Sequence, residues 1–232
     1  MNSIQKRALG PYTVLLISLL AFMLMVLFVS EGTAGDFLVN VGITVIFLAG
    51  FYVARGRRSL RRFALPVVGL GIVVEWLTYF LELPAGLHIR LLVDAILFML
   101  VAAVQLYAIL GQRRVSADTV VGGINAYLLI AISFMLIHAL LEVVEPGAYR
   151  VGDATLAEYV FGAGRSEGFA TMLYFSFVTI TTLGYGDIVP VSGAAKLTAS
   201  SEALFGQIYL AVFIARLVAL HVAAGIKGGN EE

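Results

Sequence analysis

The stretch Thr181-Thr182-Leu183-Gly184-Tyr185-Gly186-Asp187, here called the glycine loop, decides how this chain is interpreted. It follows a short apolar run, Phe169–Ile180, and precedes Pro190 and a further long apolar stretch. Glycine reaches positive φ at little steric cost, and other residues do so rarely. Glycines at alternate positions therefore allow a backbone that switches between ordinary and left-handed dihedrals and turns successive carbonyl oxygens toward one axis. The local order is helix, glycine loop, helix.

Residues 182–187 resemble the TVGYGD signature of tetrameric potassium channels, with Leu183 where Val is usual. Filters of that family are rings of backbone carbonyls that replace the hydration shell of K⁺. The resemblance implies an ion-binding filter formed by Thr182, Leu183, Gly184, Tyr185 and Gly186, with K⁺ held at the first four. In the family, the side chain at the Leu183 position points out of the pore, so the change should alter packing more than coordination. A chance glycine-rich turn is the competing explanation, and six matched residues argue against it.

The same resemblance implies residues that support the filter. The family usually has an aromatic pair at the positions of Tyr174 and Phe175, and one member donates a hydrogen bond to the aspartate after GYG. We expect Tyr174 to donate to Asp187. Some relatives place a glutamate that promotes filter inactivation at the position of Val178, and the valine argues against that route here.

Composition excludes an ordinary soluble domain. Of 232 residues, 60% are hydrophobic and 13% charged, and the mean hydropathy is +0.97. Soluble domains are nearer half apolar and one quarter charged. The absence of cysteine excludes disulfides and thiolate sites. The formal net charge of zero gives no sign of a nucleic-acid partner, and three histidines without metal-ligand spacing give none of an enzyme. We expect no cofactor beyond K⁺ ions in the filter.

We predict an all-α membrane protein with six transmembrane helices, a re-entrant pore helix and a selectivity-filter loop, assembled as a homotetramer. A helix needs roughly 17–25 residues to cross the hydrocarbon core. The stretch at about 168–181 is too short for that and fits a re-entrant helix, which must be buried in protein or face water. The six predicted spans are Pro11–Ser30, Phe37–Ala54, Phe63–Leu83, Leu87–Leu110, Thr119–Val144 and Lys196–Ala224.

The chain divides into a four-helix transmembrane domain (1–110), a short linker (111–118), a pore domain (119–224) and a short cytoplasmic tail (225–232). A linker of about eight residues cannot form the long lateral helix of domain-swapped relatives, so we expect each four-helix domain to pack against its own pore helices. Asp118 is the expected N-cap of the next helix. Residues 146–168 contain several glycines and mixed charge, and we expect a loop with little fixed structure. The tail leaves no room for a regulatory domain.

Positive charge predicts the orientation. Arginines crowd the loop after the second span, and Lys6 and Arg7 precede the first. By the positive-inside rule both termini are cytoplasmic, which places the filter on the outer side. We expect a multi-pass protein of a prokaryotic inner (plasma) membrane whose first span is retained and is not a signal peptide. The arginines are a topology signal or, in the sharper interpretation, a site for anionic lipid; they are Arg55, Arg57, Arg58, Arg61 and Arg62.

The four-helix domain lacks the arginine array of a voltage sensor. Span 87–110 carries only Arg90 and Asp94 as charged residues. One charge moved through 100 mV is worth about 2.3 kcal/mol, so voltage dependence should be weak at most. Glu75 is expected at a depth similar to that of Asp94. Arg90 lies four residues before Asp94, which is the i, i+4 spacing of neighbours on a helix. We predict a buried Glu75–Arg90–Asp94 cluster; a proton- or cation-sensing site is the alternative.

Three further residues of the pore domain stay open to two interpretations. His138 is either a hydrogen-bonded interior histidine, with Glu142 as its local partner, or a pH sensor. Gly206 is either a hinge of the inner helix or a small residue that allows close packing. Arg216 is expected to point sideways, toward lipid phosphate or an acidic residue such as Asp118, and a charged gate is the alternative.

The predicted function is a potassium-selective channel without conventional voltage gating. A non-selective cation channel is one alternative, and the aromatic Tyr185 argues against it. A potassium transporter subunit is another. Those proteins carry four non-identical pore loops in one chain, whereas this chain has one.

Overall fold

The computed structural model describes residues 10–28, 33–54, 58–81, 86–112, 116–152, 154–156 and 165–228. Helices account for most of these residues, and a small antiparallel sheet lies at one end of the molecule. The helices are α1 (Pro11–Phe28), α2 (Thr33–Ala54), α3 (Arg58–Leu81), α4 (Gly86–Leu110), α5 (Ala117–Val144), α7 (Arg165–Ile180) and α8 (Gly193–Gly228); the strands are β1 (Tyr149–Val151), β2 (Ala154–Thr155) and β3 (Ile188–Pro190).

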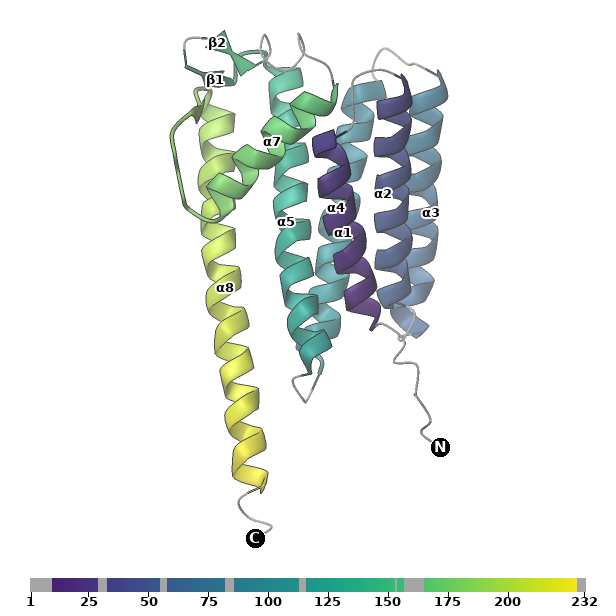
Figure 1. Ribbon diagram of the computed structural model, residues 1–232, viewed down its shortest axis with the longest axis vertical. Coiled ribbons are helices and arrows are strands. Elements are labelled where there is room, and N and C mark those ends of the chain that lie inside the picture. The colour runs from purple at the N-terminus through teal and green to yellow at the C-terminus, as the bar shows by residue number, and fades with distance from the viewer. Residues whose placement is uncertain are drawn as a thin grey trace.

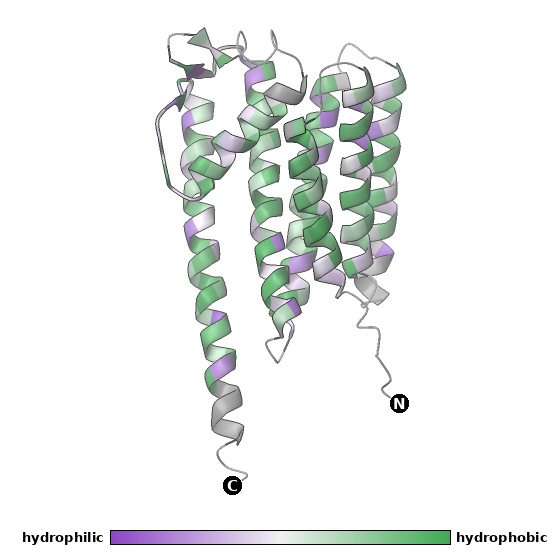
Figure 2. Ribbon diagram, viewed as in Figure 1, coloured by the Kyte–Doolittle hydropathy of each residue, from purple (hydrophilic) through white to green (hydrophobic). Residues whose placement is uncertain are grey.

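The helices coincide with the six predicted spans and the predicted re-entrant helix. Four are long and apolar enough to cross a membrane, with spans Ala34–Val53, Gly86–Leu110, Ala117–Val144 and Gly193–Val222. The apolar segments of α1 and α3 are shorter, Pro11–Val26 and Val68–Leu81. Hydrophobic residues run along nearly the whole length of the upright helices (Figure 2). Six crossings therefore remain a prediction, and four have the full length and composition for it.

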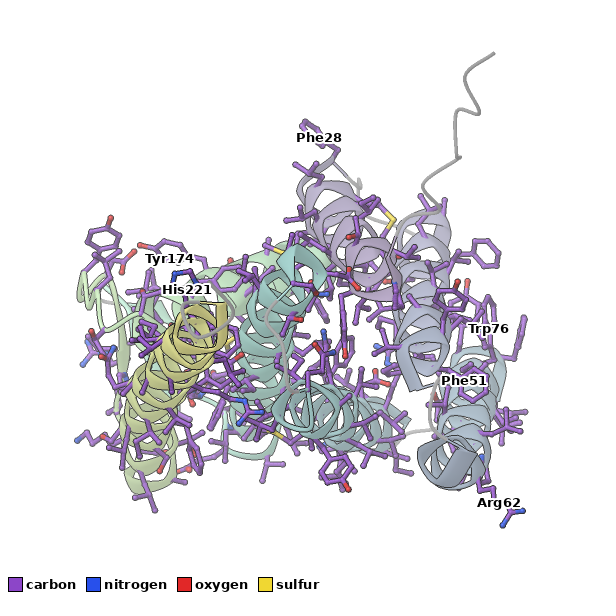
Figure 3. All side chains as sticks on the ribbon, turned by 90° about the horizontal axis from the view of Figure 1, so that it is seen from below. Phe28, Phe51, Arg62, Trp76, Tyr174 and His221 are labelled. Atoms are coloured by element: carbon purple, nitrogen blue, oxygen red, sulfur yellow. The ribbon has the colours of Figure 1, made fainter. Side chains whose placement is uncertain are left out.

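Helices α1 to α5 stand side by side, and α7 crosses obliquely between α5 and α8 (Figure 1). From the lower end of α7 the chain returns upward to β3 and then descends as α8, so α1 begins and α8 ends at the same end of the molecule. Seen along the helix axes, Tyr174 lies at one edge beside α8 and Trp76 lies at the opposite edge (Figure 3).

Helices of the predicted four-helix domain pack on the predicted pore helices within the single chain, and whether this holds between subunits of an assembly stays a prediction. Helices α1 and α4 both contact α5, and α1 also contacts α7. Two polar contacts tie these helices at depth: Gln105 Nε2 donates to the Gly122 carbonyl at 3.0 Å, and Asn125 Nδ2 donates to the Tyr12 carbonyl at 2.7 Å. Both amides are buried, so these bonds fix the docking of α5 in a low-dielectric environment where unpaired polar groups are costly.

The predicted N-cap of α5 is wrong by two residues. Ser116 is the cap: its Oγ accepts from the Thr119 backbone N–H at 3.1 Å, and Thr119 Oγ1 accepts from the Ser116 N–H at 3.2 Å. Asp118 instead accepts a hydrogen bond from Thr13 Oγ1 at 3.2 Å. Serine and aspartate cap helices about equally well, and the contact with α1 decides which of the two is used.

The segment expected to be an unstructured loop contains fixed structure. Strand β1 pairs antiparallel with both β2 and β3 in the order β2-β1-β3, with Arg150 opposite Thr155 on one side and Val189 on the other. The Glu142 carboxylate accepts from the backbone N–H groups of Gly147 at 2.8 Å and Tyr149 at 2.9 Å. The sheet thus joins the chain before α7 to the chain after the glycine loop.

Candidate functional site

The glycine loop alternates in backbone conformation at every second residue. The φ angles of Thr182, Gly184 and Gly186 are +59°, +61° and +78°, and all residues of 181–187 are exposed in the single chain. Glycine accepts this conformation freely, but a β-branched residue such as threonine adopts it only under constraint. Such an outlier is a sign of a functional site. The sequence predicted the two glycines and missed the threonine.

Backbone carbonyls in the last turn of α7 accept hydrogen bonds from the first residues of the glycine loop. The Val178 carbonyl accepts from the N–H groups of Leu183 at 2.9 Å and Gly184 at 3.3 Å, and the Thr179 carbonyl accepts from the Thr182 N–H at 2.9 Å. Val178 was considered for its side chain, yet it acts here through its backbone. These bonds hold Thr182 in its uncommon conformation.

The end of the loop is held by a side-chain contact. Tyr174 Oη donates to Asp187 Oδ2 at 2.6 Å, which is the hydrogen bond expected from the sequence. This bond lowers the pKa of Asp187 below its ordinary value of 3.8. Directly after it, β3 begins at Ile188 and pairs with β1. Both ends of the loop are therefore fixed, one to α7 alone and the other to α7 and the sheet.

The inner helix α8 approaches the loop closely at Gly206. A Cβ placed there would lie 2.5 Å from the Ile180 carbonyl oxygen, which also accepts from Tyr127 Oη at 3.1 Å. Of the two interpretations of Gly206, this contact supports close packing. The next residue, Gln207, has its Nε2 3.5 Å from Thr182 Oγ1. Sequence reasoning did not single out Gln207, because nothing in its neighbours marks which face of α8 meets the loop.

His138 is a buried, hydrogen-bonded histidine, but the predicted partner is wrong. Its Nε2 lies 2.8 Å from Glu202 Oε2 on α8, and its Nδ1 lies 2.5 Å from Tyr149 Oη on β1. Glu142 instead accepts from backbone N–H groups at the top of α5. No sequence pattern pointed to Glu202, which lies within an apolar helix far along the chain.

The predicted Glu75–Arg90–Asp94 cluster is brought together in the interior of the four-helix domain. All three side chains are buried, the two carboxyl groups lie within interaction range of each other, and Arg90 acts electrostatically on both. Among the residues that the structure describes, however, no salt bridge within 4.0 Å joins Arg90 to Glu75 or to Asp94. Both Glu75 oxygens also lack a hydrogen-bond partner. Arg90 is thus near the acids without a close salt bridge.

Arg216 contacts the end of α4, and Asp118 is not its partner. One guanidinium nitrogen, Nη2, donates to the Leu110 carbonyl at the last residue of α4 and to the Gln112 carbonyl at 3.1 Å. Helices end with unsatisfied carbonyls and a partial negative charge. Asp118 instead accepts from Thr13 Oγ1, and contact of Arg216 with lipid phosphate stays a prediction.

Most of the arginine cluster lies outside the described residues or has side chains outside them. Arg55 and Arg57 lie outside the described residues, as do Lys6 and Arg7, and the side chains of Arg58 and Arg61 are likewise outside them. Arg62 is exposed near the start of α3 (Figure 3).

The part of the chain that contains the glycine loop is similar to known proteins. Residues 148–222 match a family described as "Ion channel". "Two pore potassium channel c" of Oryza sativa subsp. japonica is 38% identical over 60 residues, which are 26% of this chain and 13% of that protein. "Voltage-gated potassium channel Kch" of Escherichia coli (strain K12) is 37% identical over 70 residues, 28% of this chain and 17% of that protein.

A third relative is covered over most of its length. "Protein LctB" of Bacillus caldotenax is 26% identical over 127 residues, which are 55% of this chain and 90% of that protein. The chain spans only 13–17% of the length of the two potassium channels above. Residues 148–222, which include the glycine loop, are therefore similar to an ion-channel pore domain, in a chain whose described helices include four that are long and apolar enough to cross a membrane.

Proposed function

We propose that this chain, an ion channel by its pore domain, conducts K⁺ selectively as a homotetramer. The carbonyl oxygens of residues 182–185, with the Thr182 hydroxyl, would hold dehydrated K⁺, and Gly186 would complete the filter. Repulsion between ions at adjacent sites lets each one leave, so transport is passive. The observation that carries the proposal is the positive φ at Thr182, Gly184 and Gly186, because that alternation turns successive carbonyls to one side of the loop.

The exposed surface of one copy supports assembly with others. Only 11% of the Gly193–Val222 span is buried, against 39–50% in the other three long spans. Large apolar side chains of the glycine loop are also exposed, Leu183 by 55% and Tyr185 by 67%. One chain supplies one loop, and a closed ring of carbonyls needs several copies around an axis. Four copies, each with its four-helix domain on its own pore helices, satisfy both requirements.

Gating by a conventional voltage sensor is not part of the proposal. Arg90 is the arginine of α4, and it is buried beside Glu75 and Asp94. Moving that single charge across the membrane would take it away from the two acids on which it acts electrostatically. The even number of helix passes puts both termini on one side, which the positive-inside rule makes the cytoplasmic side of the plasma membrane. We also propose that anionic lipid on the cytoplasmic side binds the arginine cluster, which consists of Arg55, Arg57, Arg58, Arg61 and Arg62.

The names of the relatives favour K⁺ as the conducted ion. Two alternatives differ in what they predict for conduction: a non-selective cation channel passes Na⁺ as well, and a transporter subunit passes no current alone. The identity with potassium channels is confined to short segments, so selectivity has to be measured on this protein.

The test is the reversal potential of purified protein in planar bilayers with K⁺ on one side and Na⁺ on the other. A reversal potential near the K⁺ equilibrium value is expected. Current that reverses near zero would instead establish a non-selective channel. Complete silence of protein shown to be tetrameric, at every voltage and pH tested, would contradict the channel proposal and favour the transporter alternative.

A further inference from the structure

Four buried polar side chains, one of them on α7, form a continuous line of polar contacts. They come from four different elements: Tyr149 from β1, His138 from α5, Glu202 from α8 and Ser176 from α7. Each is completely buried, with 0% of its surface exposed. Polar groups at such depth are stable only when their hydrogen bonds are made, so the protons of this chain of contacts can be assigned.

The contacts follow one another in a line. His138 Nδ1 lies 2.5 Å from Tyr149 Oη, and His138 Nε2 lies 2.8 Å from Glu202 Oε2. The other carboxyl oxygen, Oε1, contacts Ser176 Oγ. Ser176 Oγ also lies 2.7 Å from the Ala131 carbonyl oxygen on α5. Four contacts therefore connect a phenol at one end with a backbone carbonyl at the other.

The two ends of the line limit where its protons can go. The single hydroxyl proton of Ser176 can go to Glu202 Oε1 or to the Ala131 carbonyl; given to the carbonyl, which can only accept, it leaves Ser176 Oγ to accept from Glu202 Oε1. At the other end, burial is the largest effect on Tyr149 and raises the pKa of its phenol, so the phenol keeps its proton. It donates to His138 Nδ1, which leaves the histidine neutral with its proton on Nε2. All four contacts are then satisfied if Glu202 carries a proton.

The ion pair His138⁺–Glu202⁻ has the same number of protons and satisfies fewer contacts. Nδ1–H would donate to the Tyr149 oxygen, whose own proton would then lack an acceptor in this chain. Ser176 would have one proton for two acceptors. The charged or titratable groups that face His138 are Tyr149 from β1, Glu202 from α8 and, one turn along α5, Glu142, which is occupied by backbone N–H groups; α7 contributes only the uncharged Ser176. The ion pair would therefore carry the cost of burying two charges while making fewer hydrogen bonds than the neutral form.

We propose that Glu202 is a positioning residue of the filter, and that it acts as a neutral carboxylic acid which locks α7 to α8 and, through His138 and Tyr149, to the outer sheet. The inference rests on the proposed function of the glycine loop. Ser176 lies two residues before Val178, whose carbonyl holds Leu183 and Gly184. A shift of α7 would therefore move the carbonyls of the loop directly.

Infrared difference spectroscopy of the tetramer in lipid tests the proton on Glu202 without any ion flux. The variant is Glu202→Gln, and the matched control is Glu145→Gln, the same chemical change at an exposed residue at the end of α5. Glu202→Gln should lose a carboxylic-acid C=O band in a dry environment, and Glu145→Gln should lose only carboxylate bands. Loss of carboxylate bands in Glu202→Gln would overturn the proposal.

The K⁺/Na⁺ permeability ratio tests the positioning role. In Glu202→Gln the amide oxygen accepts from His138 and the amide N–H donates to Ser176, so the ratio should stay within about twofold of the parent protein. Glu202→Ala and Ser176→Ala break the line, and the ratio should fall about tenfold in each. If Glu202→Ala does not assemble as a tetramer, the permeability ratio of Ser176→Ala, which is the smaller change, provides the test. A ratio that falls as far in Glu202→Gln as in Ser176→Ala would show that a charge is needed, which overturns the proposal. Failure of the proposed function shows separately, as a reversal near zero in the unsubstituted protein.

Discussion

The Tyr174 hydroxyl and the Asp187 carboxylate are joined by a 2.6 Å hydrogen bond, which ties the middle of α7 to the residue that ends the glycine loop. The start of the same loop is bound to α7 by the Val178 carbonyl. The loop is thus clamped from one helix at both ends. Since a ring of carbonyls selects ions by its geometry and dipoles, the lifetime of the conducting shape should depend on this clamp.

Removing the hydroxyl tests the clamp. In Tyr174→Phe the aromatic ring remains and one charge-assisted hydrogen bond is lost, so we expect K⁺ current to decay about three- to tenfold faster after opening. Tyr52→Phe, the same change on the exposed surface of α2, is the control and should behave like the parent protein. Decay rates that are equal in all three proteins would contradict a role for this bond.

The response to outer pH follows from the lowered pKa of Asp187. A carboxylate whose pKa is lowered in the folded state stabilises that state above its ordinary pKa, 3.8, and this contribution is lost as the pH falls through the lowered value. The parent channel should therefore keep its current down to below pH 3.8. Tyr174→Phe should lose current at a higher pH, measured as current against outer pH. An acid limit that does not move would exclude Asp187 as its cause.

Two glycines with the same backbone conformation separate stability from selectivity. Gly184 and Gly152 have φ of +61° and +58°, and a Cβ at either would meet no atom within 4 Å of the single chain. Alanine at each should cost about 1–2 kcal/mol of backbone strain. We expect only Gly184→Ala to lower the K⁺/Na⁺ permeability ratio. A similar loss of selectivity in Gly152→Ala would show that general destabilisation is responsible.

A methyl group at Gly206 distinguishes close packing from a hinge. Its Cβ would lie 2.5 Å from the Ile180 carbonyl oxygen, so Gly206→Ala should destabilise the protein by about 1–3 kcal/mol. Gly69→Ala on α3, where a Cβ meets nothing within 4 Å, should be neutral or stabilising. Thermal unfolding measures both. A hinge would instead leave the melting temperature of Gly206→Ala unchanged and lower its open probability.

The contact of Arg216 with the end of α4 predicts a link between the two domains. Arg216→Gln loses donors to the Leu110 and Gln112 carbonyls and should lower stability by about 1 kcal/mol. Arg62→Gln removes the same charge from an exposed position and serves as the control in detergent, where no anionic lipid is present. If Arg216 were a charged gate, Arg216→Gln would raise single-channel K⁺ conductance and leave stability unchanged.

The helices could be predicted from consecutive residues, because the length of an apolar run can be compared with the thickness of a membrane. The two glycines of the loop could be recognised in the same way, whereas the Tyr174–Asp187 bond was predicted from the resemblance of residues 182–187 to the TVGYGD signature. The sequence did not reveal the positive φ of Thr182, which the surrounding hydrogen bonds impose.

The partners of the buried polar groups could be identified only once the helices were packed together. His138 meets Glu202, 64 residues away, in place of Glu142, and Arg216 meets Leu110, 106 residues away, in place of Asp118. The strands of the outer sheet are two or three residues long, too short to show an alternating pattern. A buried polar group takes whichever partner the neighbouring elements bring within about 3 Å, and which elements are neighbours depends on the packing of the whole chain.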